Sequence, residues 1–352
     1  LSRYCVIPKY GFPVDVVNLE TYEEGNLVDK YDLSRDLKIA ISEYAPDSEV
    51  IVDGKKYTSK YITLPKTGEI TKHYFCVCPR CQKINLSVSH GGMSKCSCGQ
   101  DLSNEKTQKF IEPSEGFKTG ITKESSHLKP KRSYSGEISY IGGGLKDENQ
   151  LNVKNIILAE SSSNDELLVV NKSNFYMCPM CGYSKIAKTA VLSPKTTETH
   201  KNHRQYTCSN EELELIKIGH KFQTDVVRLT IPLLTIEDRG YSKALSFLYA
   251  FLEGISMGLE IERNDLDGIL ELNSKTNSYD LLLFDNVPGG AGHVKRLMNS
   301  EAIIKSLKSA LDKVSQNCCD ENTSCYKCLR NYYNQSKHSK LIRKYAKEVI
   351  VD

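Results

Sequence analysis

The 352-residue chain lacks any apolar run close to the roughly 18 residues that a membrane-spanning helix requires. Its first residues also lack the basic start and apolar core of a secretory signal, so we expect no membrane partner. With 26% charged residues, 39% hydrophobic residues and no single-residue tract, wholesale disorder is excluded. The length predicts two or more packed units. Because the chain begins with Leu1 instead of Met, we interpret it as part of a longer protein.

Net charge of either sign is also nearly absent. Lys and Arg number 47 against 44 acids, giving +3, which excludes the global excess of a histone-like binder. Between Cys325 and Asp352, however, seven basic residues face two acids. Such clusters neutralise phosphates, although a solvated helix face explains any single member equally well. The sequence therefore predicts DNA contacts from a basic segment that comprises Arg330, Lys337, Lys340, Arg343 and Lys344.

Catalytic motifs are missing as well. The chain contains no GxSxG elbow, no HExxH and no Walker pattern GxxxxGK[ST]. The glycine-rich stretch at residues 288–293 precedes an expected helix, and we interpret it as a tight strand-to-helix turn. A rival hypothesis is a metal-dependent nuclease built around Asp225, Asp285 and neighbouring acids. We expect this chain to have no catalytic residue of its own.

Cysteine, by contrast, is abundant. Of thirteen cysteines, all but Cys5 fall into three groups, and CxxC pairs recur within the groups. This pattern is typical of zinc sites in a reducing compartment and not of a disulfide framework. It predicts a cytoplasmic protein with about three structural zinc ions.

The first group has the form of a zinc ribbon. Two pairs, Cys78 with Cys81 and Cys96 with Cys98, are separated by 14 residues that can form a short hairpin. Four thiolates close the coordination sphere, because no position is left for water. Cys76 is a fifth candidate that could displace Cys78.

The second group combines Cys178, Cys181 and Cys208 with a histidine. Three sulfurs and one imidazole complete a tetrahedral site. His203 lies five residues before Cys208 and His200 lies eight residues before it, so proximity favours His203 while His200 stays open.

The third group places four thiols within 11 residues, between an expected long helix and the basic segment. Its members are Cys318, Cys319, Cys325 and Cys328. The geometry of two adjacent cysteines is tight, so His338 could replace one of them. A metal here would hold the two flanking segments together.

Periodicity indicates an α/β (or α+β) fold. Residues 34–41 predict a short helix capped by Ser34, and residues 225–231 predict a strand that Pro232 ends. Further along, residues 242–258 predict a helix, 279–285 a buried strand and 293–314 a second helix. The alternating order suggests an α/β core in this half.

Several segments resemble a known family. Residues 6–15, 33–37 and 43–46 resemble the region behind the motor of large bacterial DEAD/DEAH-box helicases. Residues 219–227, 284–292 and 324–330, with Asn334, Gln335 and His338, resemble the MrfA-type zinc-binding (MZB) domain. The same domain occurs in the DISARM anti-phage protein DrmB, which is also similar.

The resemblance implies a non-catalytic accessory module of a superfamily 2 helicase, acting in DNA repair or anti-phage defence. ATP is then expected only in the parent helicase or in a partner subunit. The family's ligands correspond to Cys319, Cys325 and Cys328, with Cys318 as the fourth. We expect four regions: a mixed α/β entry region at 1–70, a zinc ribbon at 71–117, a linker with strands at 118–175, and the zinc-binding domain at 176–352. A protein-interaction scaffold that docks through the ribbon is the remaining alternative.

Overall fold

The computed structural model describes residues 15–68, 70–81, 83–87, 94–96, 98–120, 123–124, 136–141, 150–188, 192–237, 239–287 and 289–352. Residues 6–14 of the helicase-like segment, Pro288 and most of residues 118–135 lie outside these ranges. Within them the chain is a mixed α/β protein with extensive sheets and few helices, which confirms the expected fold class. No helix in this part of the chain is long and apolar enough to cross a bilayer.

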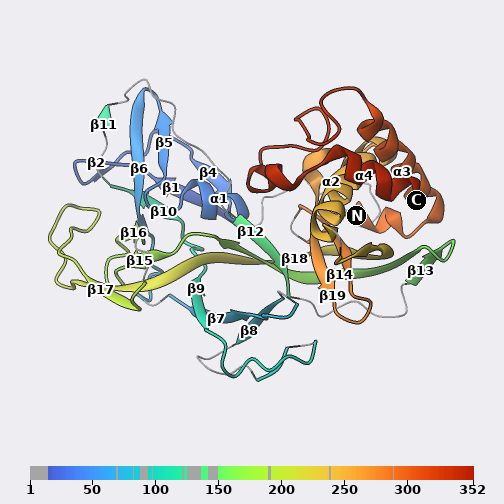
Figure 1. The fold of residues 1–352 in the computed structure, drawn as a ribbon. Coiled ribbons are helices and arrows are strands. Elements are labelled where there is room, and N and C mark those ends of the chain that lie inside the picture. The colour runs from blue at the N-terminus through green and yellow to red at the C-terminus, as the bar shows by residue number, and fades with distance from the viewer. Residues whose placement is uncertain are drawn as a thin grey trace.

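The N-terminal lobe is built on a six-stranded sheet, in the order β11-β6-β10-β1-β4 with β5 paired to β6. It is the blue part of Figure 1, with helix α1 at its inner side. Its elements are β1 (Val16–Glu20), β2 (Tyr22–Glu23), β3 (Asn26–Leu27), β4 (Ser34–Asp36), α1 (Leu37–Glu43), β5 (Glu49–Val52), β6 (Lys55–Ile62), β10 (Phe117–Thr119) and β11 (Lys123–Glu124).

Helix α1 begins later than the sequence predicts. Residues 34–36 are extended because they pair with β1, with Val16 opposite Asp36. The helix is capped by Asp36, whose carboxylate accepts a hydrogen bond from the Lys38 amide at 2.8 Å. The expected Ser34 cap was therefore wrong, because Ser34 is part of strand β4 and pairs with Asn18 of β1.

A second, twelve-stranded sheet connects the whole molecule. Its two longest strands, β14 and β18, pair antiparallel and run beneath both lobes in Figure 1. Residues 157–171 thus lie in one sheet with the C-terminal half. The strands are β7 (Lys72–Val77), β8 (Ile84–Ser87), β9 (Gln108–Ile111), β12 (Gly136–Tyr140), β13 (Gln150–Val153), β14 (Ile157–Asn171), β15 (Phe175–Met177), β16 (Ser184–Ile186), β17 (Lys195–Thr197), β18 (Glu212–Thr235), β19 (Leu266–Asn273) and β20 (Ser278–Asp285).

Pro232 interrupts β18 without ending it. The strand continues to Thr235, but its register against β20 shifts between Thr230 and Thr235. A proline has no amide hydrogen to give to the ladder, so the pairing breaks while the chain stays extended. The expected strand end at Pro232 was wrong for this reason.

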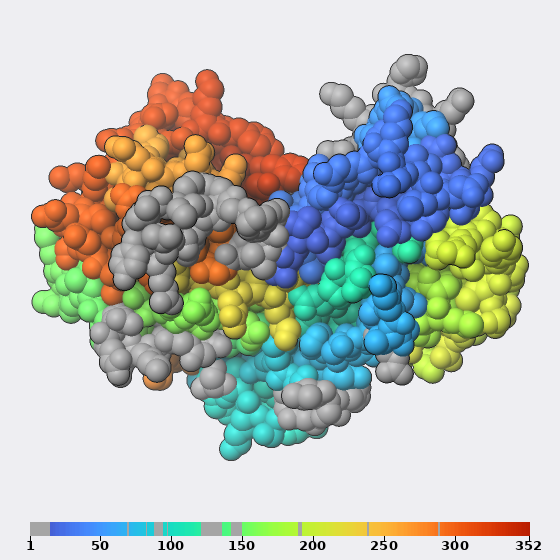
Figure 2. Space-filling model, turned by 180° about the vertical axis from the view of Figure 1, so that it is seen from behind, coloured from blue at the N-terminus to red at the C-terminus, as the bar shows by residue number. Residues whose placement is uncertain are grey.

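The C-terminal lobe packs three helices on this sheet. They are α2 (Gly240–Leu259), α3 (Ser300–Ser315) and α4 (Arg343–Val351), with short 3₁₀ turns η3 (Arg263–Asp265), η4 (Val294–Leu297) and η5 (Gln335–Lys340). Helices α2 and α3 touch closely, since a Cβ on Gly254 would fall 2.2 Å from the Ser306 carbonyl oxygen. Figure 2 shows this lobe in orange and red, beside the blue N-terminal lobe.

The helix expected at residues 293–314 is divided. Its first part is the 3₁₀ turn η4, and α3 begins only at Ser300. The Asn299 side chain accepts hydrogen bonds from the amides of Glu301 and Ala302, at 2.8 and 3.4 Å. A side-chain cap of this kind starts a new helix, which apolar spacing alone does not reveal.

Candidate metal centres and basic surface

The structure brings the clustered cysteines together in three groups. In each group the ligand atoms all lie within 4.8 Å of one another. The groups are Cys78, Cys81, Cys96 and Cys98; Cys178, Cys181, His200 and Cys208; and Cys318, Cys319, Cys325 and Cys328. These three clusters are suited to structural zinc ions, as the sequence predicts.

The distances between sulfur atoms fit a tetrahedral ion. They are 3.6 Å for Cys78 to Cys98 and 3.9 Å for Cys319 to Cys328. Zinc–sulfur bonds of about 2.3 Å place the corners of a tetrahedron about 3.8 Å apart. Disulfide sulfurs lie about 2.05 Å apart, so these thiols are not bonded pairs.

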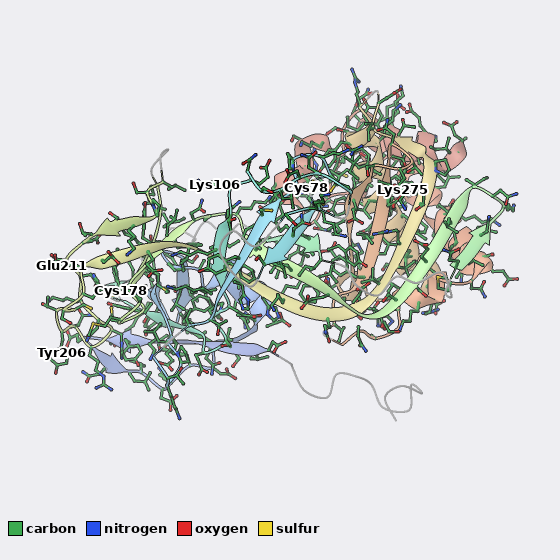
Figure 3. The ribbon with its side chains drawn as sticks, turned by 90° about the horizontal axis from the view of Figure 1, so that it is seen from below. Cys78, Lys106, Cys178, Tyr206, Glu211 and Lys275 are labelled. Carbon is green, nitrogen blue, oxygen red and sulfur yellow. The ribbon has the colours of Figure 1, made fainter. Side chains whose placement is uncertain are left out.

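The first cluster lies at the end of a hairpin. Strands β7 and β8 pair antiparallel, and the Cys78 amide donates to the Lys83 carbonyl at 3.0 Å to close the turn between them. Cys76, the fifth candidate, is placed opposite Asn85 in the ladder, and its sulfur is not one of the four that converge. Figure 3 shows Cys78 in this ribbon, apart from Cys178 of the second cluster.

In the second cluster the structure brings His200 to the three cysteines, instead of the His203 that proximity in the sequence favours. His200 Nε2 lies 3.2 Å from the Cys181 sulfur, and Nδ1 lies 2.8 Å from the Glu198 carbonyl oxygen. That second contact orients the ring, as partners behind a metal ligand generally do. His203 instead packs edge-on against the Tyr22 ring, at 5.1 Å between centroids.

The third cluster joins the segments around α3 and α4. All four cysteines converge, so both Cys318 and Cys319 lie in the group despite their adjacency. His338, the alternative ligand, contacts the Asn331 carbonyl and the Asn334 side chain, at 3.1 and 2.8 Å from Nε2. It therefore stabilises the turn that precedes η5.

One thiol in each cluster has a lowered pKa. Burial opposes ionisation of all three, but hydrogen bonds to sulfur outweigh it. The amide two residues further along is the largest lowering contribution for Cys96 and Cys325, whose pKa values fall to about 6 and about 7. For Cys178 the hydrogen bond from the Asn210 side chain is the largest lowering contribution, and the pKa falls to about 7. Zinc binding requires thiolates, so these donors favour the metal-bound form.

The basic segment divides into structural and accessible cations. Arg343 is buried, and its guanidinium donates to the carbonyl oxygens of Val314 and Cys319, at 3.4 and 2.6 Å. This side chain thus docks α4 on the third cluster, and its burial disfavours the DNA contact that the sequence predicts for Arg343. Lys340 and Lys344 are exposed.

Two further cations of the segment are partly buried. Arg330 donates to the hydroxyls of Ser324 and Thr323, at 3.0 and 3.1 Å. Lys337 donates to the Tyr249 hydroxyl at 3.4 Å. Both keep part of their surface open to solvent. DNA contacts from Arg330, Lys337, Lys340 and Lys344 stay predictions.

Asp225 and Asp285, the acids of the nuclease hypothesis, both accept hydrogen bonds from backbone amides of one loop. Asp285 is fully buried and accepts hydrogen bonds from the amides of Ala291, His293 and Val294, at 2.6 to 3.0 Å. Asp225 accepts from the Gly292 amide at 3.0 Å and pairs with Lys295 at 2.6 Å. Their oxygens are thus occupied by the strand-to-helix turn that follows β20.

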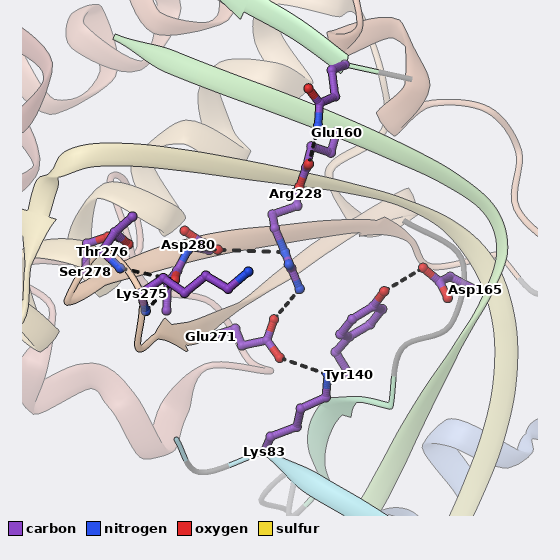
Figure 4. Close-up of polar contacts among 12 residues, drawn as sticks. Lys83, Tyr140, Glu160, Asp165, Arg228, Glu271, Lys275, Thr276, Ser278 and Asp280 are labelled. Carbon is purple, nitrogen blue, oxygen red and sulfur yellow. Dashed lines mark hydrogen bonds and ion pairs between the residues drawn. The ribbon is translucent and has the colours of Figure 1, made fainter. Parts of the chain in front are cut away.

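A network of charged side chains connects Lys83, which precedes β8, to β18 and β19 (Figure 4). The Lys83 ammonium lies 3.6 Å from Glu271 on β19 and 5.2 Å from the centre of the Tyr140 ring. Glu271 also pairs with Arg228 on β18, which approaches Asp280 at 3.8 Å. Besides the backbone pairing of β7 with β9, this ion pair links the ribbon to the C-terminal strands of the sheet.

Comparison with known proteins supports one part of the resemblance directly. Residues 247–329 match the family model described as the MrfA Zn-binding domain. The chain is 25% identical over 405 aligned residues to the Druantia protein DruE of Escherichia coli (strain UMEA 4076-1). That alignment covers 98% of this chain and 21% of DruE, so the chain spans about a fifth of its relative.

Two solved structures of the DUF1998 helicase MrfA are also similar. The structure bound to DNA gives a TM-score of 0.45 at 10% identity, covering 95% of this chain and 33% of MrfA. The structure bound to DNA and AMPPNP gives 0.36 at 8% identity, covering 94% and 31%. The third cluster lies within the matched residues, and the other two clusters precede them. The resemblance to the MrfA-type zinc-binding domain is confirmed for residues 247–329, which contain the third cysteine cluster.

Proposed function

We propose that this chain is a zinc-stabilised, non-catalytic accessory module of a DNA helicase or translocase, acting in DNA repair or anti-phage defence. The observation that carries the proposal is the third cluster, which lies inside the MrfA Zn-binding match and beside the basic segment. Three metal ions hold the fold, and exposed cations such as Lys340 and Lys344 contact DNA phosphates. The motor lies in the same polypeptide or in a partner subunit.

Two observations speak against the nuclease alternative. Asp225 and Asp285 already receive backbone hydrogen bonds, so their oxygens are committed to holding the turn at residues 289–294. Asp225 also carries an ammonium partner, Lys295, where a metal ion would otherwise bind. A structural role accounts for both carboxylates.

A scaffold that binds a protein partner is the second candidate. Around the second cluster, Met180 and Tyr206 are 61% and 69% exposed. Exposed apolar side chains of this size can anchor a protein contact. Binding to neither single-stranded nor duplex DNA would favour this candidate over the first.

The test is fluorescence anisotropy of labelled oligonucleotides with the zinc-replete chain across a salt series. We expect log affinity to fall linearly with log salt, because phosphate contacts release counterions. Replacing Arg330 and Lys344 together by Ala should flatten the slope by roughly one and a half units, since each contact adds about 0.7 to 0.9. An unchanged slope would assign both side chains to a solvated surface.

A further inference from the structure

A cleft lies between the two lobes. Its volume is about 330 Å³, and its walls come from α1, the start of β12, α2, β19, η5 and the segment before η5. This volume is at the lower end of the range for small-ligand sites. In Figure 1 the dark red segment that precedes α4 lies beside α1, and both line this space. We refer to this space as the inter-lobe cleft.

One wall of the inter-lobe cleft is aromatic. Tyr241 and Tyr333 line it and are 38% and 46% exposed. Tyr241 is held edge-on against Tyr279 at 5.8 Å between ring centroids, and the Lys340 ammonium lies 4.8 Å from the Tyr241 ring centre. With Lys340 and Tyr279 beside it, Tyr241 still keeps 38% of its surface exposed, which leaves room for a stacked base. Exposed aromatic faces beside a cation are suited to a nucleobase.

The rim above this wall is basic. Lys172 follows β14 and donates to the Ser336 hydroxyl at 3.2 Å, which brings the large sheet and η5 together. Lys337 is positioned by the Tyr249 hydroxyl at 3.4 Å. Among the described residues, neither ammonium forms an ion pair with a carboxylate, and the same holds for Lys340. Positive charge on this rim is therefore available to an anion.

The opposite wall carries acids beside a buried lysine. Burial lowers the pKa of Lys38, and the charges of Asp267 and Asp36, which line the same wall, oppose that shift. Its ammonium also contacts the Asn286 side chain and lies 4.9 Å from the centre of the Phe222 ring. The cleft thus has a basic, aromatic wall, while its carboxylates are Asp36, Glu137 and Asp267.

We propose that the inter-lobe cleft binds single-stranded DNA. A base stacks on Tyr241 or Tyr333, and the adjoining phosphates lie on Lys172, Lys337 and Lys340. This combination of π-faces and a basic rim is the general means by which proteins hold a single strand without sequence preference. A cavity of this volume admits an unpaired nucleotide and excludes a duplex. The inference rests on the proposed function and adds the strand form and the surface.

The experiment measures the affinity of the zinc-replete chain for a labelled 12-nucleotide single strand and for the corresponding duplex. Replacing Tyr241 and Tyr333 together by Ala should weaken single-strand binding at least about fivefold, with the salt slope unchanged, because stacking is largely uncharged. Replacing Lys172 and Lys337 together by Ala should flatten the single-strand slope by about 1.4 units. Neither pair should change duplex affinity.

Matched controls separate the cleft from general effects. The Tyr241→Phe and Tyr333→Phe pair keeps both rings and should bind like the parent chain. Replacing Lys275 and Lys305 by Ala removes two exposed lysines outside the cleft lining and should leave the affinity for a single strand unchanged at fixed salt. Zinc content and far-ultraviolet circular dichroism verify that each variant is folded.

The outcomes are distinct. If the parent chain binds no DNA, the proposed function and this inference are both wrong. If it binds single strands but the tyrosine and lysine pairs both bind like the parent, the inference alone is wrong. Equal losses for duplex would contradict strand selectivity. Competition by thymidine monophosphate at the same concentration as the oligonucleotide would show a free-nucleotide site instead and overturn the inference.

Discussion

The first and third cysteine clusters have the same four thiols but different surroundings. Cys328 belongs to the largest apolar core, together with residues of α2, β20 and α3, and the other cysteines of its cluster pack against that core. The first cluster forms a small core of its own in which Leu102 is the one buried apolar residue that is not a cysteine, among the described residues. Two sites of equal chemistry therefore differ in how much of the fold depends on them.

The largest effect should follow from Cys328→Ser. A structural zinc contributes apparent binding energy on the order of 10 kcal/mol, comparable to the whole unfolding free energy of a domain. Because Cys328 is only 2% exposed and lies in the main core, we expect the C-terminal lobe to unfold or aggregate. Thermal unfolding followed by circular dichroism, with metal analysis, measures this. Lys327→Ala, an exposed change in the same turn, is the control. A Cys328→Ser variant that melts like the parent would show that no structural metal binds there.

Cys78→Ser should have a smaller effect. It removes a ligand of equal strength, but the ribbon around it shares little apolar surface with the C-terminal helices. We expect the loss of close to one zinc ion per chain while α2 and α3 keep their helical signal. Arg80→Ala, an exposed change in the same turn, should retain the full metal content. Global unfolding of Cys78→Ser would contradict the distinction between the two sites.

The second cluster extends the comparison of the metal sites to a site with a histidine. Contacts in the folded chain, and not spacing in the sequence, indicate which histidine belongs to it. His200→Ala should lose close to one zinc ion, whereas His203→Ala should keep all three, since the His203 ring packs on Tyr22 outside the cluster. Metal analysis of both purified variants decides between the two residues. Loss of zinc in His203→Ala with retention in His200→Ala would reverse the ligand assignment.

The smallest effect concerns the ion pair between Lys83 of the ribbon and Glu271 on β19. Lys83→Ala removes one partner of Glu271, which keeps its pairing with Arg228. We expect a loss of about 1 kcal/mol, between the values for exposed and buried ion pairs. A double-mutant cycle with Glu271→Gln measures the coupling, and Lys95→Ala on the same ribbon is an exposed control. A coupling energy of zero would show that Lys83 does not hold the ribbon in place.

Local spacing predicted much of these sites. The CxxC pairs indicated three metal clusters, and the structure brings those cysteines together. The choice of His200 over His203 could not be predicted, because it depends on the Glu198 carbonyl and on the stacking of Tyr183 on His200. These contacts form only when the surrounding strands fold.

In the basic segment, too, the sequence could not indicate which side chains become buried on folding. The charge pattern predicted a DNA contact for Arg343 as for its basic neighbours. In the folded chain, however, Arg343 is buried and donates to the Cys319 carbonyl oxygen. Likewise, Asp36 caps α1 because Ser34 is engaged in a strand, and that pairing joins residues distant in the sequence. Sequence patterns report composition and local period, whereas burial and pairing depend on the complete fold.

Hydrogen exchange by pulse labelling of Cys78→Ser and Cys328→Ser, compared with the parent chain, tests the difference between the two clusters most directly. In Cys78→Ser we expect faster exchange in β7 and β8, with α2 and α3 protected as in the parent. In Cys328→Ser we expect α2, α3 and α4 to lose protection while β7 and β8 keep theirs. Loss of protection in α2 and α3 to the same extent in both variants would contradict the separation of the two sites.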